Sequence, residues 1–110
     1  KRKQAVEKLH CGIDKSFELL ENHLWETLKL FSGYSFTTVK GLRFHYTVNG
    51  NEILIDRKKK AITRSSVDIA LKETMGMKGN VNGPKKLNVF GASYLYPIFL
   101  RFGLIKMERE

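Results

Sequence analysis

The residues best suited to chemistry in this sequence are basic side chains gathered in its middle. Residues 57–60 read Arg-Lys-Lys-Lys, and a second basic pair stands at positions 85–86. Lysine and arginine bind phosphate groups through charge and hydrogen bonds, with an affinity that falls as salt is added. These residues therefore predict contacts with the phosphate backbone of DNA or RNA.

The net charge supports this interpretation because it is concentrated in one segment. The chain carries a formal charge of +9, and residues 56–86 hold nine Lys or Arg against three Asp or Glu. Two thirds of the excess positive charge thus falls between these positions. A basic stretch also serves solubility, so a solvated basic face with no ligand remains the alternative.

Three polar residues just after the basic run form a second candidate site. Thr63, Arg64 and Ser65 are expected at the start of a helix, where unpaired backbone N–H groups and the helix dipole favour an anion. The alternative is an ordinary Ser/Thr helix cap. A helix-turn-helix is disfavoured, because a strand and the lysine run come before this segment where that motif needs a helix.

One predicted strand offers further donors. Arg43, His45 and Thr47 alternate with apolar residues, which places all three on one side of a sheet. Donors on a sheet face can contact base edges in a major groove, as β-ribbon proteins do. The alternative is a solvated sheet face.

Asp56 and Lys58 resemble one half of the signature of metal-dependent nucleases. In that signature an acid binds a divalent metal and a lysine positions or activates the attacking water. A second acid is needed from the preceding strand, but residues 42–48 contain none, and only Glu52 and Glu18 could substitute. Nuclease activity is therefore the weakest alternative, and no catalytic residue is predicted.

Other site chemistry finds no support. Cys11 follows His10, but adjacent residues of a helix point in different directions and cannot pair. The histidines are scattered without the spacing of zinc ligands. The glycines at positions 76, 79 and 83 do not match a phosphate-binding loop. Neither a metal nor a cofactor is expected.

Hydrophobic spacing predicts the elements that hold these residues. Residues 4–31 repeat apolar side chains every three or four positions, which predicts one long amphipathic helix ending near Gly33. Gly12 interrupts the repeat and marks either a bend or a later start capped by Asp14. The polar side of the helix would carry Glu18, Glu21 and Glu26.

Alternation and turn residues predict the rest of the fold. Residues 34–39, 42–48 and 52–55 are expected as strands, with Asn49-Gly50 as a type I′ hairpin turn. A helix capped by Thr63 or Ser66 follows, and residues 76–84 form a glycine-rich loop. The last helix would use Ser93 as its N-cap, tolerate Pro97 and end at Gly103.

These elements predict a single α+β domain over residues 1–110, in the order α-β-β-β-α-α. A long N-terminal helix and C-terminal helices would pack on a three-stranded antiparallel meander. The lone cysteine excludes an internal disulfide and favours a reducing, cytoplasmic compartment. No apolar run is long enough for a membrane span, and the start at Lys1 is compatible with a fragment of a longer chain.

The sequence therefore predicts a small nucleic-acid-binding protein with an accessory or regulatory role. The main alternative is a protein-interaction module, either a homodimer or an inhibitor-like partner, that uses the long helix or the apolar segment 94–102. The residues predicted to contact nucleic acid are Arg43, His45, Lys58, Lys59, Lys60, Thr63, Arg64, Ser65, Lys85 and Lys86.

Overall fold

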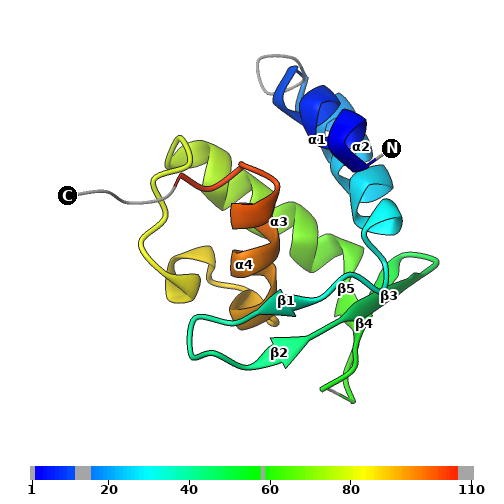
Figure 1. Ribbon diagram of the computed structural model, residues 1–110. Coiled ribbons are helices and arrows are strands. Elements are labelled where there is room, and N and C mark those ends of the chain that lie inside the picture. Colours follow the sequence, from blue (N-terminus) through cyan, green and yellow to red (C-terminus); the bar gives the residue numbers. More distant parts are fainter. Residues whose placement is uncertain (1, 12–15, 58, 107–110) are drawn as a thin grey trace.

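The chain folds as a mixed α+β structure, which confirms the predicted class (Figure 1). The computed structural model describes residues 2–11, 16–57 and 59–106. The helices are α1 (Arg2–Cys11), α2 (Phe17–Leu30), α3 (Arg64–Gly76) and α4 (Ala92–Arg101), with a 3₁₀ helix η1 (Pro84–Leu87). The strands are β1 (Phe36–Thr37), β2 (Arg43–Phe44), β3 (Tyr46–Asn49), β4 (Glu52–Ile55) and β5 (Ile62–Thr63). Within the described ranges, no helix combines the length and the apolar character that crossing a membrane requires.

The prediction of one long N-terminal helix is wrong. Two helices, α1 and α2, pack against each other in its place (Figure 1). Ser16 begins α2, and its hydroxyl accepts a hydrogen bond from the Leu19 backbone N–H at 3.2 Å. The apolar repeat continues in phase through both helices, so the repeat alone does not reveal where the chain reverses. The features predicted at Gly12 and Asp14 lie outside the described residues.

The strands form two small antiparallel sheets in place of one three-stranded meander. β1 pairs with β2, while β3, β4 and β5 form the second sheet in that order. The predicted strand 42–48 divides at His45, whose backbone N–H donates to Asp56 Oδ1 at 3.1 Å. The predicted alternation of faces holds from Arg43 onward, with Phe44, Tyr46, Ile53 and Ile55 buried and Arg43, His45 and Thr47 exposed. It fails at Leu42, an apolar residue of the predicted strand that is 48% exposed.

The hairpin between β3 and β4 turns one residue later than predicted. Asn49 pairs with Glu52, so Gly50 and Asn51 are the two turn residues. Gly50 has a φ of 62°, whereas Asn51 is not among the described non-glycine residues with positive φ. This combination fits a type II′ turn, which needs glycine only at its first central position. The predicted and observed registers bury the same strand faces, so alternation does not distinguish them.

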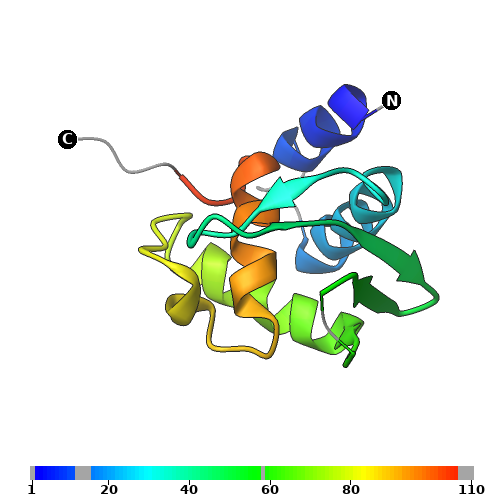
Figure 2. The same cartoon turned by 60° about the horizontal axis from the view of Figure 1, so that its bottom comes forward.

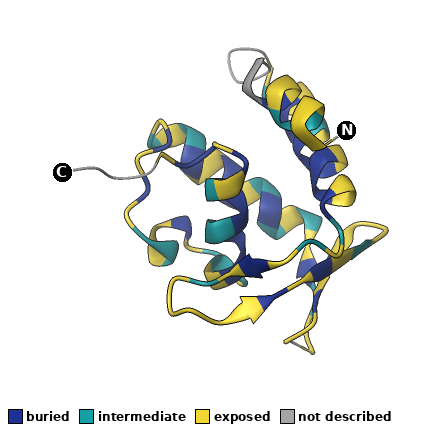
Figure 3. Cartoon of the chain, in the orientation of Figure 1, coloured by how far each residue is buried: buried dark blue, intermediate teal, exposed yellow. Residues whose placement is uncertain are grey.

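Helix α4 forms the centre of the core. Its Leu95, Ile98 and Phe99 are fully buried, and Figure 2 shows the helix between the β1–β2 hairpin and α3. The Tyr94 ring packs edge-on against the Phe44 ring of β2, with centroids 4.9 Å apart. Thus α4 covers the β1–β2 sheet, a role predicted for the long N-terminal helix together with the C-terminal helices. Figure 3 shows buried and intermediate residues along most of α4, in contrast to the largely exposed connections around it.

The ends of the last two helices agree only in part with the sequence. Thr63 caps α3, because its hydroxyl accepts a hydrogen bond from the Ser66 backbone N–H at 3.2 Å. The prediction of Ser93 as the N-cap of α4 is wrong, since the helix already begins at Ala92, after Gly91. Gly103 has the expected left-handed conformation after this helix, with a φ of 81°.

Gly91→Ala is expected to lower the free energy of unfolding by about 3 kcal/mol, the sum of backbone strain and overpacking. Gly91 has a φ of 83°, and a β-carbon on it would clash with the Cδ1 and Cγ1 atoms of Ile62 in β5. Gly50→Ala is the matched control, because its φ is 62° but nothing lies within 4 Å of the added atom. The control should cost about 1 kcal/mol. Equal losses for the two variants in urea denaturation would contradict the steric argument.

Candidate nucleic-acid interface

Two long stretches of this chain contain no acidic residue. No Asp or Glu occurs between Glu26 and Glu52, or between Glu73 and Glu108. The first stretch holds β1 and β2, the second holds η1 and α4, and contacts between α4 and β1 bring the two together. The fold therefore assembles a region whose charged side chains are all cationic among the residues that the structure describes.

The basic run after β4 extends this region. The connection between β4 and β5 and the β1–β2 hairpin lie on the lower side of Figure 1, and η1 lies to the left of α4, above the hairpin; all three are away from the α1–α2 pair. Lys60 Nζ in this connection lies 4.9 Å from the centre of the Phe90 ring. We call the exposed cations of these three segments the basic face: Lys40, Arg43, Arg57, Lys59, Lys60, Lys85 and Lys86.

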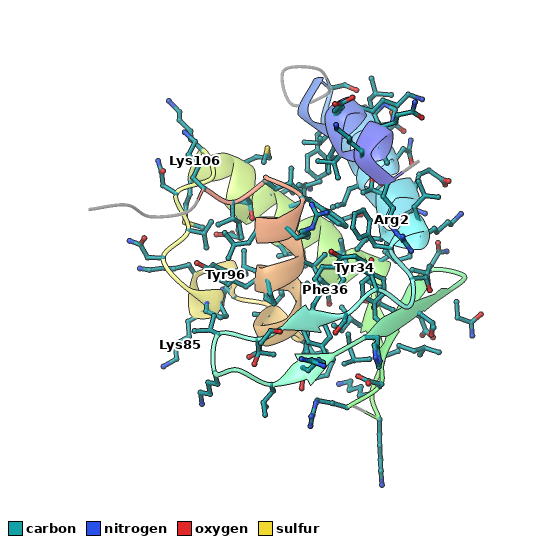
Figure 4. All side chains as sticks on the ribbon, viewed as in Figure 1. Arg2, Tyr34, Phe36, Lys85, Tyr96 and Lys106 are labelled. Carbon is teal, nitrogen blue, oxygen red and sulfur yellow. The ribbon has the colours of Figure 1, made fainter. Side chains whose placement is uncertain are left out.

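An open hollow of about 540 Å³ lies between η1 and the start of α4. Lys85, Phe90 and Ser93 line it, together with Pro84, Asn88, Val89 and Ala92. Because the ammonium of Lys60 reaches the Phe90 ring, the two basic groups of the sequence converge beside this hollow. Figure 4 shows Lys85 on the side of the molecule away from Arg2.

Arg43 and His45 lie where the two sheets meet, and hydrogen bonds from or to neighbouring residues engage the His45 side chain and the Arg43 backbone. His45 Nδ1 is 2.9 Å from Asp56 Oδ2, and the His45 backbone N–H donates to the other oxygen of the same carboxylate. The Nε–H of Arg57 donates to the Arg43 carbonyl at 2.6 Å. Asp56 is therefore an acid at the edge of the basic face whose two oxygens are both engaged by His45.

Arg64, a predicted phosphate contact, is engaged inside the protein. Its guanidinium donates two hydrogen bonds to the Glu21 carboxylate, at 2.6 and 3.0 Å. It also donates to Asn22 and Asn51, and its central carbon lies 4.8 Å from the centre of the Trp25 ring. A phosphate would have to displace these partners, so Arg64 serves first to link α2 to α3.

The start of α3 is poorly suited to an anion. The Thr63 oxygen accepts from the helix N–H group of Ser66, which is the capping alternative stated for this segment. Ser65 is exposed, but Glu52 and Asp68 line the shallow hollow beside it. Because these carboxyl groups oppose an anionic ligand, we leave the start of α3 out of the basic face.

Glu21 and Asp68 form an acidic pair beside Arg64. The hydrogen bond from Arg64 holds the pKa of Glu21 below its ordinary range. Burial raises the pKa of Asp68 to about 6, and the neighbouring Glu21 adds to this effect. Asp68 Oδ1 is buried without a hydrogen-bond partner among the described residues. Glu21 is itself buried, which corrects its predicted place on the solvated side of the helix.

The structure does not complete a metal site around Asp56, the acid of the nuclease half-motif, within the part of the chain that it describes. Among residues 2–11, 16–57 and 59–106, no cluster of three or more His, Cys, Asp or Glu side chains could hold a metal ion. The carboxylate of Asp56 contacts His45. Lys58, predicted both as part of this motif and as a phosphate contact, lies outside the described residues.

The comparisons give no family assignment. No protein-family model matches the chain, and no curated protein or solved structure is significantly similar to it. Function is therefore inferred from the basic face and its surroundings.

Three residues near this face were not among the predicted contacts. Lys40 and Arg57 could have been included by searching for cations in stretches without acids. Phe90 is 40% exposed, and no local signal marks it, because an apolar residue is by default assigned to the core. Its exposure follows from the left-handed residues on either side, Asn88 and Gly91.

Proposed function

We propose that this chain binds nucleic acid through its phosphate backbone, with the basic face as the contact surface. The observation that carries the proposal is the convergence of three cationic segments, distant in sequence, on one side of a fold. Such a one-sided field attracts a polyanion and orients it on approach. A cation distribution that served only solubility would not need to be concentrated in this way.

Residues of the basic face, and His45 beside it, have distinct roles in this proposal. Lys59, Lys60, Lys85 and Lys86 supply salt-sensitive contacts to phosphates. Arg43 and His45 stand at the junction of the two sheets, where they would contact sugar or base edges. The role is accessory or regulatory, in the cytoplasm, and the chain performs no catalysis of its own.

The alternative of a protein-interaction module receives less support. Its first surface, a single long helix, is replaced by the α1–α2 pair. Its second surface, residues 94–102, supplies the core helix α4, in which Leu95, Ile98 and Phe99 are fully buried by the chain itself. These three side chains of α4 are therefore not available to a partner.

Changing four lysines of the basic face to glutamine tests the proposal. The variant carries Lys59→Gln, Lys60→Gln, Lys85→Gln and Lys86→Gln. The slope of log K against log salt is negative, and each lost phosphate contact should make it shallower by about 0.9 for duplex DNA. We expect the affinity at about 0.1 M salt to fall roughly 10- to 100-fold, measured by fluorescence anisotropy with DNA and RNA probes.

The matched control removes the same charge from the other side of the molecule. It carries Lys3→Gln, Lys8→Gln, Lys29→Gln and Lys72→Gln, all exposed positions on α1, α2 and α3. The control should keep most of the affinity, because only net charge is lost. Equal losses in the two variants, or no binding by the unchanged protein at low salt, would overturn the proposal.

A further inference from the structure

The hollow between η1 and α4 contains an exposed aromatic ring among cations. Phe90 is 40% exposed and lines the hollow with Lys85, while the Lys60 ammonium lies 4.9 Å from its ring centre. The hollow measures about 540 Å³, within the roughly 300–1,000 Å³ of small-ligand sites. An aromatic ring flanked by cations is the combination with which proteins bind a base and its neighbouring phosphates.

The segment that carries Phe90 is held in place by its backbone and by β5. Asn88 and Gly91, on either side of the ring, have left-handed φ values of 55° and 83°. The Asn88 N–H donates to the Lys85 carbonyl at 3.2 Å, and Gly91 lies directly against the Ile62 side chain. The backbone that carries the Phe90 ring is therefore already ordered, and less conformational entropy is lost when a ligand binds to the ring.

The chemistry of the hollow distinguishes between two forms of nucleic acid. In a duplex the faces of the bases are stacked on one another, whereas a single strand leaves them accessible to an aromatic side chain. A phosphate-binding face alone would suit either form, and an exposed ring beside it favours the single strand.

From this arrangement we infer that the chain binds single-stranded nucleic acid, with one base replacing the Lys60 ammonium over the Phe90 ring and the adjoining phosphates on Lys60 and Lys85. This inference rests on the proposed function and adds the form of the ligand and the place of a base. Stacking involves no hydrogen-bond pattern, so binding would tolerate any base.

Three probes of equal backbone length separate stacking from charge. They are an oligothymidylate of about 12 nucleotides, an abasic strand of the same length, and the corresponding duplex, titrated by fluorescence anisotropy. The unchanged protein should bind the oligothymidylate roughly 5- to 100-fold more tightly than the abasic strand, because only the former offers a base to stack.

Phe90→Ala should remove this preference and leave affinity for the abasic strand within about twofold, because phosphate contacts alone remain. Phe90→Leu keeps an apolar side chain without a π-face and should behave like Phe90→Ala, while Phe90→Trp should restore the preference. Ile69→Ala is the matched control, since Ile69 is an exposed apolar residue on α3, at 50% exposure. Thermal unfolding of each variant checks that the fold is retained.

The outcomes distinguish the stacking inference from the proposal that the basic face binds the phosphate backbone. If the unchanged protein binds all three probes equally and Phe90→Ala changes nothing, the stacking inference is overturned while backbone binding stands. If the lysine variant of the basic face also binds as well as the unchanged protein, backbone binding on this face fails too. Absence of binding to every probe at low salt would overturn both.

Discussion

Arg64→Ala should lower the free energy of unfolding by about 3 kcal/mol, which is within the range for breaking a largely buried ion pair. The Arg64 and Glu21 side chains are only 28% and 11% exposed, and two hydrogen bonds of 2.6 and 3.0 Å join them. The substitution leaves the Glu21 carboxylate without its cation and next to Asp68. It also removes the contact of the guanidinium with the Trp25 ring.

Urea denaturation at neutral pH measures this loss. Lys29→Ala is the matched control, because Lys29 pairs with Glu26 at 3.2 Å through side chains that are 50% and 69% exposed. Such a surface pair contributes about 0.5 kcal/mol or less. Arg64→Lys should fall between the two, since an ammonium group cannot donate in the two-pronged geometry of a guanidinium. A loss under about 1 kcal/mol for Arg64→Ala would show that the α2–α3 link does not depend on this pair.

Asp68→Asn should stabilise the protein at neutral pH, by about 3 kcal/mol. Burial and Glu21 raise the pKa of Asp68 from 3.8 to about 6, and each unit corresponds to about 1.4 kcal/mol. The folded chain thus holds the proton of Asp68 more tightly than the unfolded chain does. Its contribution to stability is full below pH 3.8 and is lost as the pH rises through about 6.

Unfolding free energies measured at several pH values test the sign. The advantage of Asp68→Asn over the unchanged protein should be small near pH 4 and should grow until about pH 7. Glu21 has the opposite dependence, because its pKa is lowered from 4.5 and its contribution is lost only as the pH falls further. Glu73→Gln, at an exposed acid on the same helix, serves as the control. An advantage that stays constant with pH would contradict the role assigned to the Asp68 proton.

The sequence predicts well those features that depend on neighbouring residues. Alternation along residues 43–55 identified the buried side of the strands. Local cap chemistry predicted Gly103 correctly and named Thr63 as one of two candidate caps of α3. The sequence did not reveal that residues 4–31 divide into α1 and α2, because the apolar repeat keeps the same phase in both helices. The register of the β3–β4 hairpin could not be predicted either, because the predicted and the observed register both bury Tyr46 and Ile53.

The candidate site shows the same division. The lysines at positions 59, 60, 85 and 86 are visible as charge in the sequence, and the structure leaves them exposed. Arg64 is engaged by Glu21, which lies 43 positions earlier in the chain. No local sequence pattern could therefore show that Arg64 has an internal partner. The position of Phe90 beside Lys60 likewise depends on how β5 packs against the start of α4.

The position of α4 has a consequence for how this chain is made. The Phe36 ring contacts the rings of Phe31, Phe44 and Tyr46. Tyr94 of α4 and Phe102, the residue just after α4, complete this cluster. A ribosome releases the earlier segments first. Until α4 and Phe102 have emerged, the nascent chain lacks the rings that complete this aromatic cluster, and we expect this to be the interval in which it is most exposed to aggregation.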